Sequence, residues 1–189
     1  MFDKMIVLIG MPGCGKTTIG RILAQELGVP FVDTDNLIRE AEGMPLPKIQ
    51  QEKGMDYFLR AEEHALLSLD DSPKVVATGG SAVFCEHGMM YLGSIATVIL
   101  LETDLKMLMR RMGDPKKRGV VLGPNQTIMG VFRERRPLYL RYADIRVRTY
   151  HTRPKDVVAK ILAVLPGAEA GGAEPDAGED KKDRNEEGG

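Results

Sequence analysis

The first 28 residues constrain the fold of this chain more than any other segment. Residues 5–9 form a continuous apolar run, MIVLI, which is typical of a strand buried on both faces of a parallel sheet. A glycine-rich stretch follows at residues 10–17, with the sequence GMPGCGKT. Residues 16–27 then carry apolar side chains at helical spacing and stop at Gly28. The order strand, glycine loop, helix is therefore predicted.

The glycine loop matches the pattern G-x-x-x-x-G-K-[ST] without a mismatch. Glycines let backbone N–H groups curl around a β-phosphate, and the following helix turns its positive N-terminal end toward that phosphate. Lys16 would place its charge between the β- and γ-phosphates, and the Thr17 hydroxyl would bind Mg²⁺. We therefore expect ATP with Mg²⁺ at this loop. The nucleotide-binding residues expected here are Gly13, Cys14, Gly15, Lys16, Thr17 and Thr18.

Four further strands are predicted, with helical patterns between them. They lie at residues 31–32, 74–77, 95–101 and 144–147. Strands alternating with helices predict a three-layer α/β domain whose parallel sheet has five strands and binds ligands at their carboxyl ends. We assign this domain to residues 1–165. The tail, residues 166–189, has no aromatic residue, no β-branched residue and no Leu or Met, so we expect it to be disordered.

Composition and charge argue against several classes of partner. The formal net charge of −1 provides no basic surplus for nucleic acid. No stretch approaches the roughly 20 apolar residues of a membrane span, and the apolar run at residues 5–9 comes too early for a signal peptide. Cys14 and Cys85 cannot form a disulfide framework and lack zinc-site spacing. We expect a cytoplasmic protein with reduced thiols, with Cys14 either a redox switch or a small residue at a variable loop position.

Two carboxylates follow the second predicted strand directly, in the sequence Val32-Asp33-Thr34-Asp35. If both lie on one face at the strand tip, Asp33 can organise Mg²⁺ through water. Asp35 can then orient or deprotonate a hydroxyl that attacks the γ-phosphorus. The alternative is that the pair caps a helix that begins near Asn36.

Six segments, in this order, resemble the shikimate kinase family, whose members phosphorylate the 3-hydroxyl of shikimate in aromatic amino-acid (chorismate) biosynthesis. They are GMPGCGKTT (10–18), FVDTDNLI (31–38), GMDYFLRAEEHAL (54–66), ATGGSAV (77–83), KKRGVVL (116–122) and RRPLYLRYAD (135–144). The similarity spans residues 5 to about 162. It implies a P-loop kinase that works as a monomer, with a helical substrate-binding insertion near residues 34–62 and a mobile lid near residues 113–125.

The resemblance also implies roles for individual residues. Lys16, Asp35 and the lid residue Arg118 would act in catalysis, and Thr17 and Asp33 would serve the metal. Contacts with the carboxylated acceptor are expected from Asp35, Arg60, Gly79, Gly80 and Arg135. Further contacts with the nucleotide are expected from Arg111, Arg118 and Arg153. The two arginines Arg60 and Arg135 would clamp the acceptor's carboxylate, because a guanidinium presents a fork of donors to two oxygens.

Two departures from the family pattern leave the acceptor open. The family usually has three glycines at the third strand, whereas this chain has Gly79-Gly80-Ser81. The lid usually contains Arg-Pro-Leu-Leu, whereas residues 118–122 here are RGVVL, and glycine in place of proline removes a fixed φ. An alternative acceptor is another small carboxylated alcohol such as homoserine. An alternative of another class is a nucleotide-dependent regulator that does no chemistry, which would not need the base Asp35.

Overall fold

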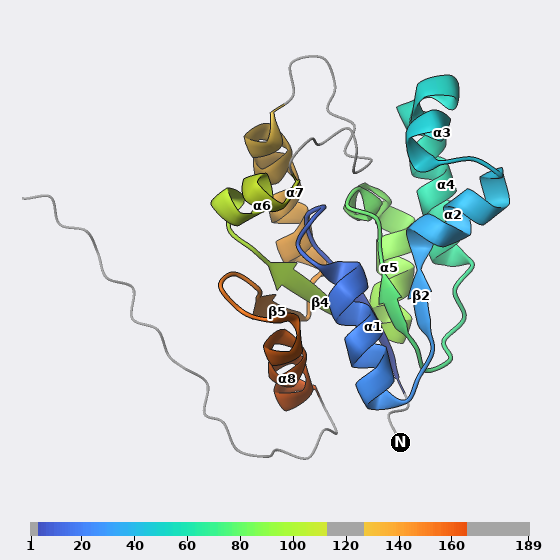
Figure 1. The fold of residues 1–189 in the computed structure, drawn as a ribbon. Coiled ribbons are helices and arrows are strands. Elements are labelled where there is room, and N and C mark those ends of the chain that lie inside the picture. The colour runs from blue at the N-terminus through green and yellow to red at the C-terminus, as the bar shows by residue number, and fades with distance from the viewer. Residues whose placement is uncertain (1–3, 113–126, 166–189) are drawn as a thin grey trace, which may run out of the picture.

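A computed structural model describes residues 4–112 and 127–165, with the side chains of residues 111 and 112 excepted. The five-stranded parallel sheet predicted from the sequence is confirmed, with the strand order β2-β3-β1-β4-β5 (Figure 1). The strands are β1 (Met5–Ile9), β2 (Phe31–Asp33), β3 (Val75–Ala77), β4 (Ala96–Glu102) and β5 (Ile145–Arg148). The expected lid and tail lie outside the described residues.

The central strand explains the apolar run at the start of the chain. Strand β1 pairs with β3 on one side and β4 on the other, with Val7 opposite both Val76 and Val98. All five of its side chains are fully buried. A strand enclosed on both faces has no polar side, so its sequence does not alternate.

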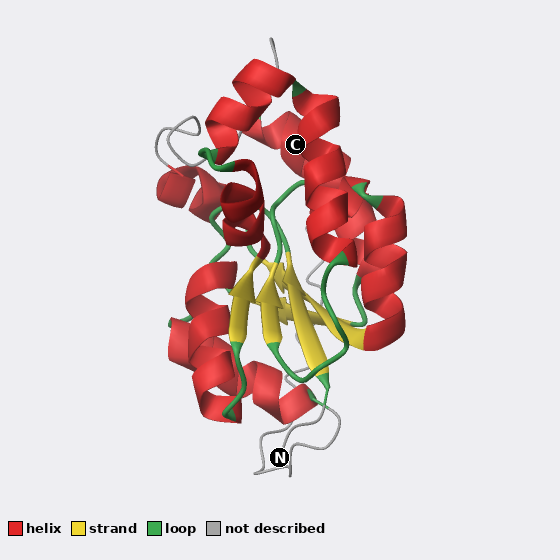
Figure 2. Ribbon diagram, turned by 90° about the vertical axis from the view of Figure 1, so that its right-hand side faces the viewer, coloured by secondary structure: helices red, strands yellow, loops and turns green. Residues whose placement is uncertain are grey.

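Helices cover both faces of the sheet, giving the three layers visible in Figure 2. Helices α1 (Lys16–Leu27) and α8 (Pro154–Val164) pack against each other, and α5 (Glu86–Ile95) packs on β4. The other helices are α2 (Thr34–Glu42), α3 (Leu46–Lys53), α4 (Met55–Leu67), the 3₁₀ turn η1 (Ala82–Phe84), α6 (Leu105–Met112) and α7 (Ile128–Tyr142). The main apolar core lies between these layers.

The insertion formed by α2, α3 and α4 has a small core of its own. Its buried members are Ile38, Leu46, Ile49, Phe58 and Ala65, which come from all three helices. This separate cluster lets the insertion hold its internal shape beside the sheet, to the right of the sheet in Figure 1.

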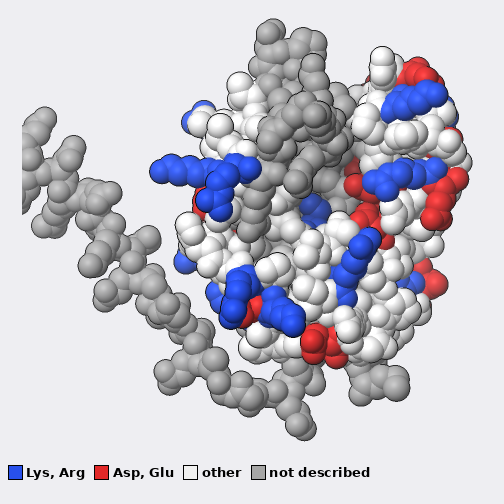
Figure 3. Space-filling model, in the orientation of Figure 1, with Lys and Arg blue, Asp and Glu red and all other residues white. Residues whose placement is uncertain are grey.

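The surface carries both signs of charge. On the face that Figure 3 displays, Lys and Arg side chains lie among Asp and Glu side chains. Elsewhere along the chain, exposed ion pairs such as Lys48 with Glu52 and Arg141 with Glu86 also join the two signs of charge. Among residues 4–112 and 127–165, no helix combines the length and the apolar character that a membrane span requires.

Candidate active site

One cavity of about 710 Å³ lies at the carboxyl ends of the strands. The glycine loop forms its floor, and the turn after β3 forms one side. A second wall is formed by four residues that follow β5: Thr149, Thr152, Pro154 and Val157. The insertion forms the opposite wall through Leu46, Gln50, Met55, Phe58 and Glu62. The cavity is large enough for a nucleotide and a small acceptor side by side.

The glycine loop holds Lys16 at the cavity floor. Its ammonium donates hydrogen bonds to the carbonyl oxygens of Gly10, at 2.7 Å, and Met11, at 3.2 Å. Cys14, Gly15, Thr17 and Thr18 also line the cavity, as the sequence motif predicts for a phosphate site. The Cys14 side chain is fully buried, which does not suit a thiol that has to meet an oxidant.

Asp33 is placed both to organise a metal beside the glycine loop and to cap a helix, the two roles that the sequence left as alternatives. Its Oδ2 accepts a hydrogen bond from the Thr17 hydroxyl at 2.9 Å, which places a carboxylate and a hydroxyl together beside the loop. Its Oδ1 accepts from the backbone N–H of Asp35 at 3.1 Å and thereby caps α2. The helix begins at Thr34, so the expectation that Asp33 and Asp35 share one face of a strand is wrong. Asp35 lies in the first helical turn instead.

Asp35 lines the cavity as a largely buried acid. Burial, and then the neighbouring charge of Asp33, raise the pKa of this carboxyl group. Lys16 and Arg39 oppose the rise. A carboxylate with a raised pKa is a stronger base, so this position suits a group that accepts a proton from an alcohol.

The turn after β3 packs tightly against both neighbouring elements. A Cβ on Gly79 would lie 2.2 Å from Glu62 Oε1, and one on Gly80 would lie 2.6 Å from Pro12 of the glycine loop. The absence of a side chain at residue 80 therefore lets the loop approach the turn. The carbonyl of Gly80 accepts a hydrogen bond from the Tyr139 hydroxyl at 2.6 Å.

This bond also positions Arg135. Tyr139 lies one turn after Arg135 on α7, so both side chains face the turn after β3. The Arg135 guanidinium stacks over the Phe84 ring, with its carbon 5.4 Å from the ring centre, and lines the cavity. Within the described residues its Nε has no hydrogen-bond partner although that atom is buried. Arg135 is therefore oriented to receive an anion.

Arg60 lies differently. It is two residues from both Phe58 and Glu62, which line the cavity, and two residues on a helix are about 200° apart around the axis. Its side chain is exposed, and its guanidinium carbon lies 5.9 Å from the centre of the Tyr57 ring. The expected pairing of Arg60 with Arg135 across one cavity is not seen.

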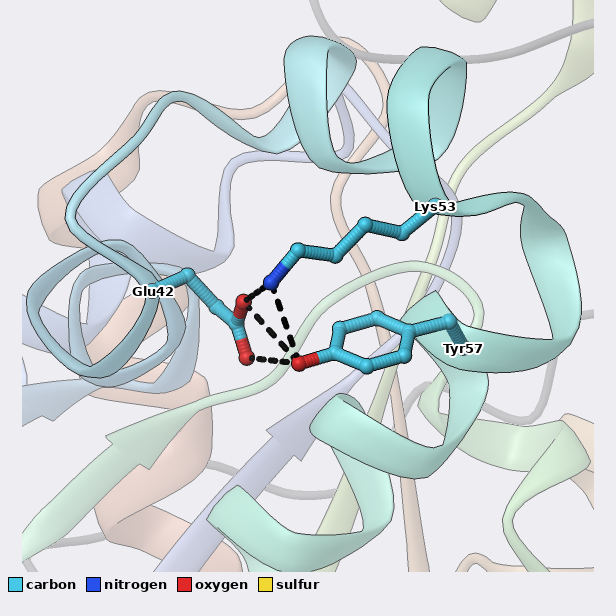
Figure 4. A network of polar contacts seen from close by, with 3 residues as sticks. All are labelled: Glu42, Lys53 and Tyr57. Carbon is cyan, nitrogen blue, oxygen red and sulfur yellow. Dashed lines mark hydrogen bonds and ion pairs between the residues drawn. The ribbon is translucent and has the colours of Figure 1, made fainter.

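Tyr57 belongs to a polar network that ties the insertion's three helices together (Figure 4). Its hydroxyl contacts Glu42 at 3.0 Å, and the Lys53 ammonium contacts Glu42 at 2.6 Å and the Tyr57 hydroxyl at 3.1 Å. These hydrogen bonds lower the pKa of Glu42 and raise that of Lys53. The network fixes α2, α3 and α4 relative to one another near Arg60.

The structure does not place any of the other three expected arginines in the cavity. Arg153 is 85% exposed and forms two hydrogen bonds with Asp156, while its neighbours Thr152 and Pro154 line the cavity. Arg118 lies outside the described residues. Arg111 lies in the last turn of helix α6, and its side chain is not described.

The sequence patterns missed the role of two residues in the insertion wall, Gln50 and Glu62. Glu62 is 2% exposed, although a charged residue of a helix usually lies on the solvated face. Burial raises the pKa of its carboxyl group to about 7, and Asp35 adds to the rise; the Ser81 hydroxyl, Arg135 and Lys16 oppose it. The signal was present in the spacing, because Glu62 continues the buried stripe of Phe58 and Leu66 on α4.

Comparison with known proteins identifies the family. The family model described as shikimate kinase matches residues 12–166. The chain belongs to the shikimate kinase family. Shikimate kinase of Aquifex aeolicus is 34% identical over 88% of this chain and 99% of its own length. That of Mycobacterium avium is 39% identical over 87% of this chain and 94% of its own length.

Solved structures of the family agree with the fold. Shikimate kinase from Acinetobacter baumannii, determined in complex with shikimate, superposes with a TM-score of 0.79 at 31% identity. The match covers 85% of this chain and 91% of that one. The Aquifex aeolicus enzyme superposes with a TM-score of 0.73 at 33% identity, over 84% and 94% of the two chains. Shikimate kinases use ATP as a substrate. Membership of this family makes the protein a phosphotransferase with an alcohol group as acceptor.

Proposed function

We propose that this kinase transfers the γ-phosphoryl group of ATP to the 3-hydroxyl of shikimate, giving shikimate 3-phosphate and ADP. The observation that carries the proposal is that Lys16, Asp35 and Arg135 line a single cavity although they lie far apart in the sequence. Each supplies one requirement of the reaction: a cation for the phosphates, a base for the alcohol and a cation for the carboxylate. Curated relatives that this chain matches over nearly their whole length support the choice of acceptor.

The loop residues bind the donor. Backbone N–H groups at the start of α1 are available for the phosphates, and Lys16 exchanges its bonds with two loop carbonyls for bonds with phosphate oxygens. The carboxylate of Asp33 and the hydroxyl of Thr17 are hard oxygen donors that fit Mg²⁺ and would hold it with the phosphates. When bound, this ion supplies positive charge that neutralises the phosphate oxygens.

The acceptor-side residues orient the alcohol. Arg135 binds the carboxylate and so fixes which hydroxyl is directed toward the donor. Asp35 accepts a hydrogen bond from that hydroxyl and takes its proton as the O–P bond forms. The proposed roles of Arg118 and of the lid, which are to stabilise the transferring group and to exclude water, concern residues outside the described part of the chain.

A coupled assay of ADP release tests the proposal. The full chain is supplied with ATP, Mg²⁺ and one acceptor: shikimate, homoserine or gluconate. We expect turnover with shikimate that falls at least a hundredfold in Asp35→Asn, which keeps the shape of the side chain and removes the base. Absence of turnover with shikimate would reject this acceptor. Turnover of any alcohol that is lost in Asp35→Asn eliminates the alternative of a regulator without chemistry.

A further inference from the structure

The insertion wall of the cavity carries a buried oxygen that accepts no hydrogen bond. Among the described residues, Gln50 Oε1 is buried without a hydrogen-bond partner. The carboxyl group of Glu62 is buried beside it, with the Ser81 hydroxyl as its nearest donor. A buried polar atom without a partner destabilises the fold, so such atoms in a cavity point to a ligand that supplies the missing donors. Both residues line the same cavity as Asp35 and Arg135.

The helix geometry explains why these two side chains face the cavity. Gln50 follows Leu46 by one turn on α3, and Glu62 follows Phe58 by one turn on α4. Leu46 and Phe58 are anchored in the insertion's small core. This packing fixes the rotation of both helices, so that Gln50 is directed into the cavity while the next residue, Gln51, is exposed.

The polar side chains of the insertion wall favour one kind of chemical group on the acceptor. Glu62 and Asp35 repel a second anionic group from this part of the cavity, and Arg135 provides the place for the carboxylate. A glutamine amide presents either its oxygen or its NH₂ group, and a hydroxyl can pair with both because it donates and accepts. The wall therefore favours an acceptor that carries hydroxyl groups in addition to the one that reacts.

We propose that Gln50 determines acceptor specificity by hydrogen bonding to a hydroxyl of the acceptor that is not phosphorylated. This inference rests on the proposed function and names a further contact in the same site. Shikimate carries two such hydroxyls, at C4 and C5. A simpler hydroxy acid that lacks them leaves the buried side-chain oxygen of Gln50 without a donor and binds more weakly.

The test combines protein variants with acceptor analogues. The wild-type protein, Gln50→Leu and the control Gln51→Leu are each assayed for kcat and KM with shikimate, 4-deoxyshikimate and 5-deoxyshikimate. Gln51→Leu makes the same chemical change at an exposed position of the same helix. For wild type and for Gln51→Leu, we expect kcat/KM with one of the two deoxy analogues to be about tenfold or more below kcat/KM with shikimate. For Gln50→Leu the same comparison should give a decrease of less than about threefold, because the hydroxyl that the analogue lacks has no Gln50 side chain to bond with in this variant.

The variant should also show its effect in KM rather than in kcat. We expect Gln50→Leu to raise the KM for shikimate about tenfold, with the KM for ATP unchanged, since the contact is made before and during the reaction. Equal discrimination by wild type and Gln50→Leu against both analogues would overturn the inference and leave the proposed function intact. Failure of the wild type to phosphorylate shikimate would overturn both. Gln50→Met provides a second apolar variant of similar length if Gln50→Leu does not fold.

Discussion

The buried acid Glu62 should make stability depend on pH. The carboxyl group is 2% exposed, and its pKa rises from 4.5 to about 7, first through burial and then through Asp35. The folded protein thus holds this proton more tightly than the unfolded chain does. The contribution to stability is complete below about pH 4.5 and is lost as the pH rises through about 7, where the folded protein has to carry a buried charge.

Substituting Glu62→Gln removes this loss, because glutamine has a similar shape and does not ionise. The rise of the pKa from 4.5 to about 7 corresponds to between about 3 and 4 kcal/mol, at roughly 1.4 kcal/mol per pKa unit. Between pH 5 and pH 8 the free energy of unfolding of Glu62→Gln should therefore rise, relative to wild type, by about 2 to 3 kcal/mol. Asp35 is present in both proteins, so most of its own pH dependence cancels in the difference.

Urea unfolding at pH 5, 6, 7 and 8 measures this difference. Far-UV circular dichroism is the suitable probe because the chain contains no Trp. The control is Glu63→Gln, since that side chain is 30% exposed and faces His87 at 3.4 Å. Its difference from wild type should stay within about 0.5 kcal/mol over the same range. A constant difference between Glu62→Gln and wild type from pH 5 to pH 8 would refute the reasoning, since it would mean that Glu62 is no harder to ionise in the folded protein.

Two further substitutions test the geometry of the site. Gly80→Ala places a methyl group 2.6 Å from the rigid ring of Pro12, so the glycine loop has to shift and kcat/KM for ATP should fall about tenfold or more in steady-state assays. The control Gly93→Ala adds a methyl group that meets nothing within 4 Å and should leave activity unchanged. Arg135→Lys keeps the charge but loses the fork, so the KM for the acceptor should rise at least about tenfold with the KM for ATP unchanged. The control Arg133→Lys changes an exposed position of the same helix and should behave like wild type.

The phosphate-loop part of the site was predictable because its determinants are local in sequence. Strand β1, the glycine loop and α1 follow one another within 28 residues, and each has its own signature in apolar pattern or glycine spacing. Backbone amides at a helix N-terminus bind phosphates whatever the rest of the fold does. Only one of the two contacts of Asp33 is local: its Oδ1 caps α2 two residues away, whereas Thr17, which donates to its Oδ2, lies 16 residues earlier.

The acceptor half depends on contacts that the sequence does not display. Whether Arg60 or Glu62 faces the cavity depends on the rotation of α4, which is set by packing of Phe58 and Ala65 in the insertion's core. A motif match can align an arginine in the sequence and still leave its direction undetermined. The close contact of Gly80 with Pro12 joins segments that are 68 residues apart, and no local pattern encodes that distance.

The two cores of this protein separate donor recognition from acceptor recognition. The main core fixes the sheet edge, and with it Lys16 and Asp33. The insertion's core fixes Gln50 on α3, whereas Glu62 lies on α4 between Phe58 of the insertion's core and Leu66 of the main core. A substitution on the cavity side of α3 can therefore alter which acceptor binds without disturbing the phosphates. On this reasoning, differences in acceptor preference among kinases of this fold should be concentrated in α3, α4 and the turn after β3, where this chain carries Ser81 beside Glu62.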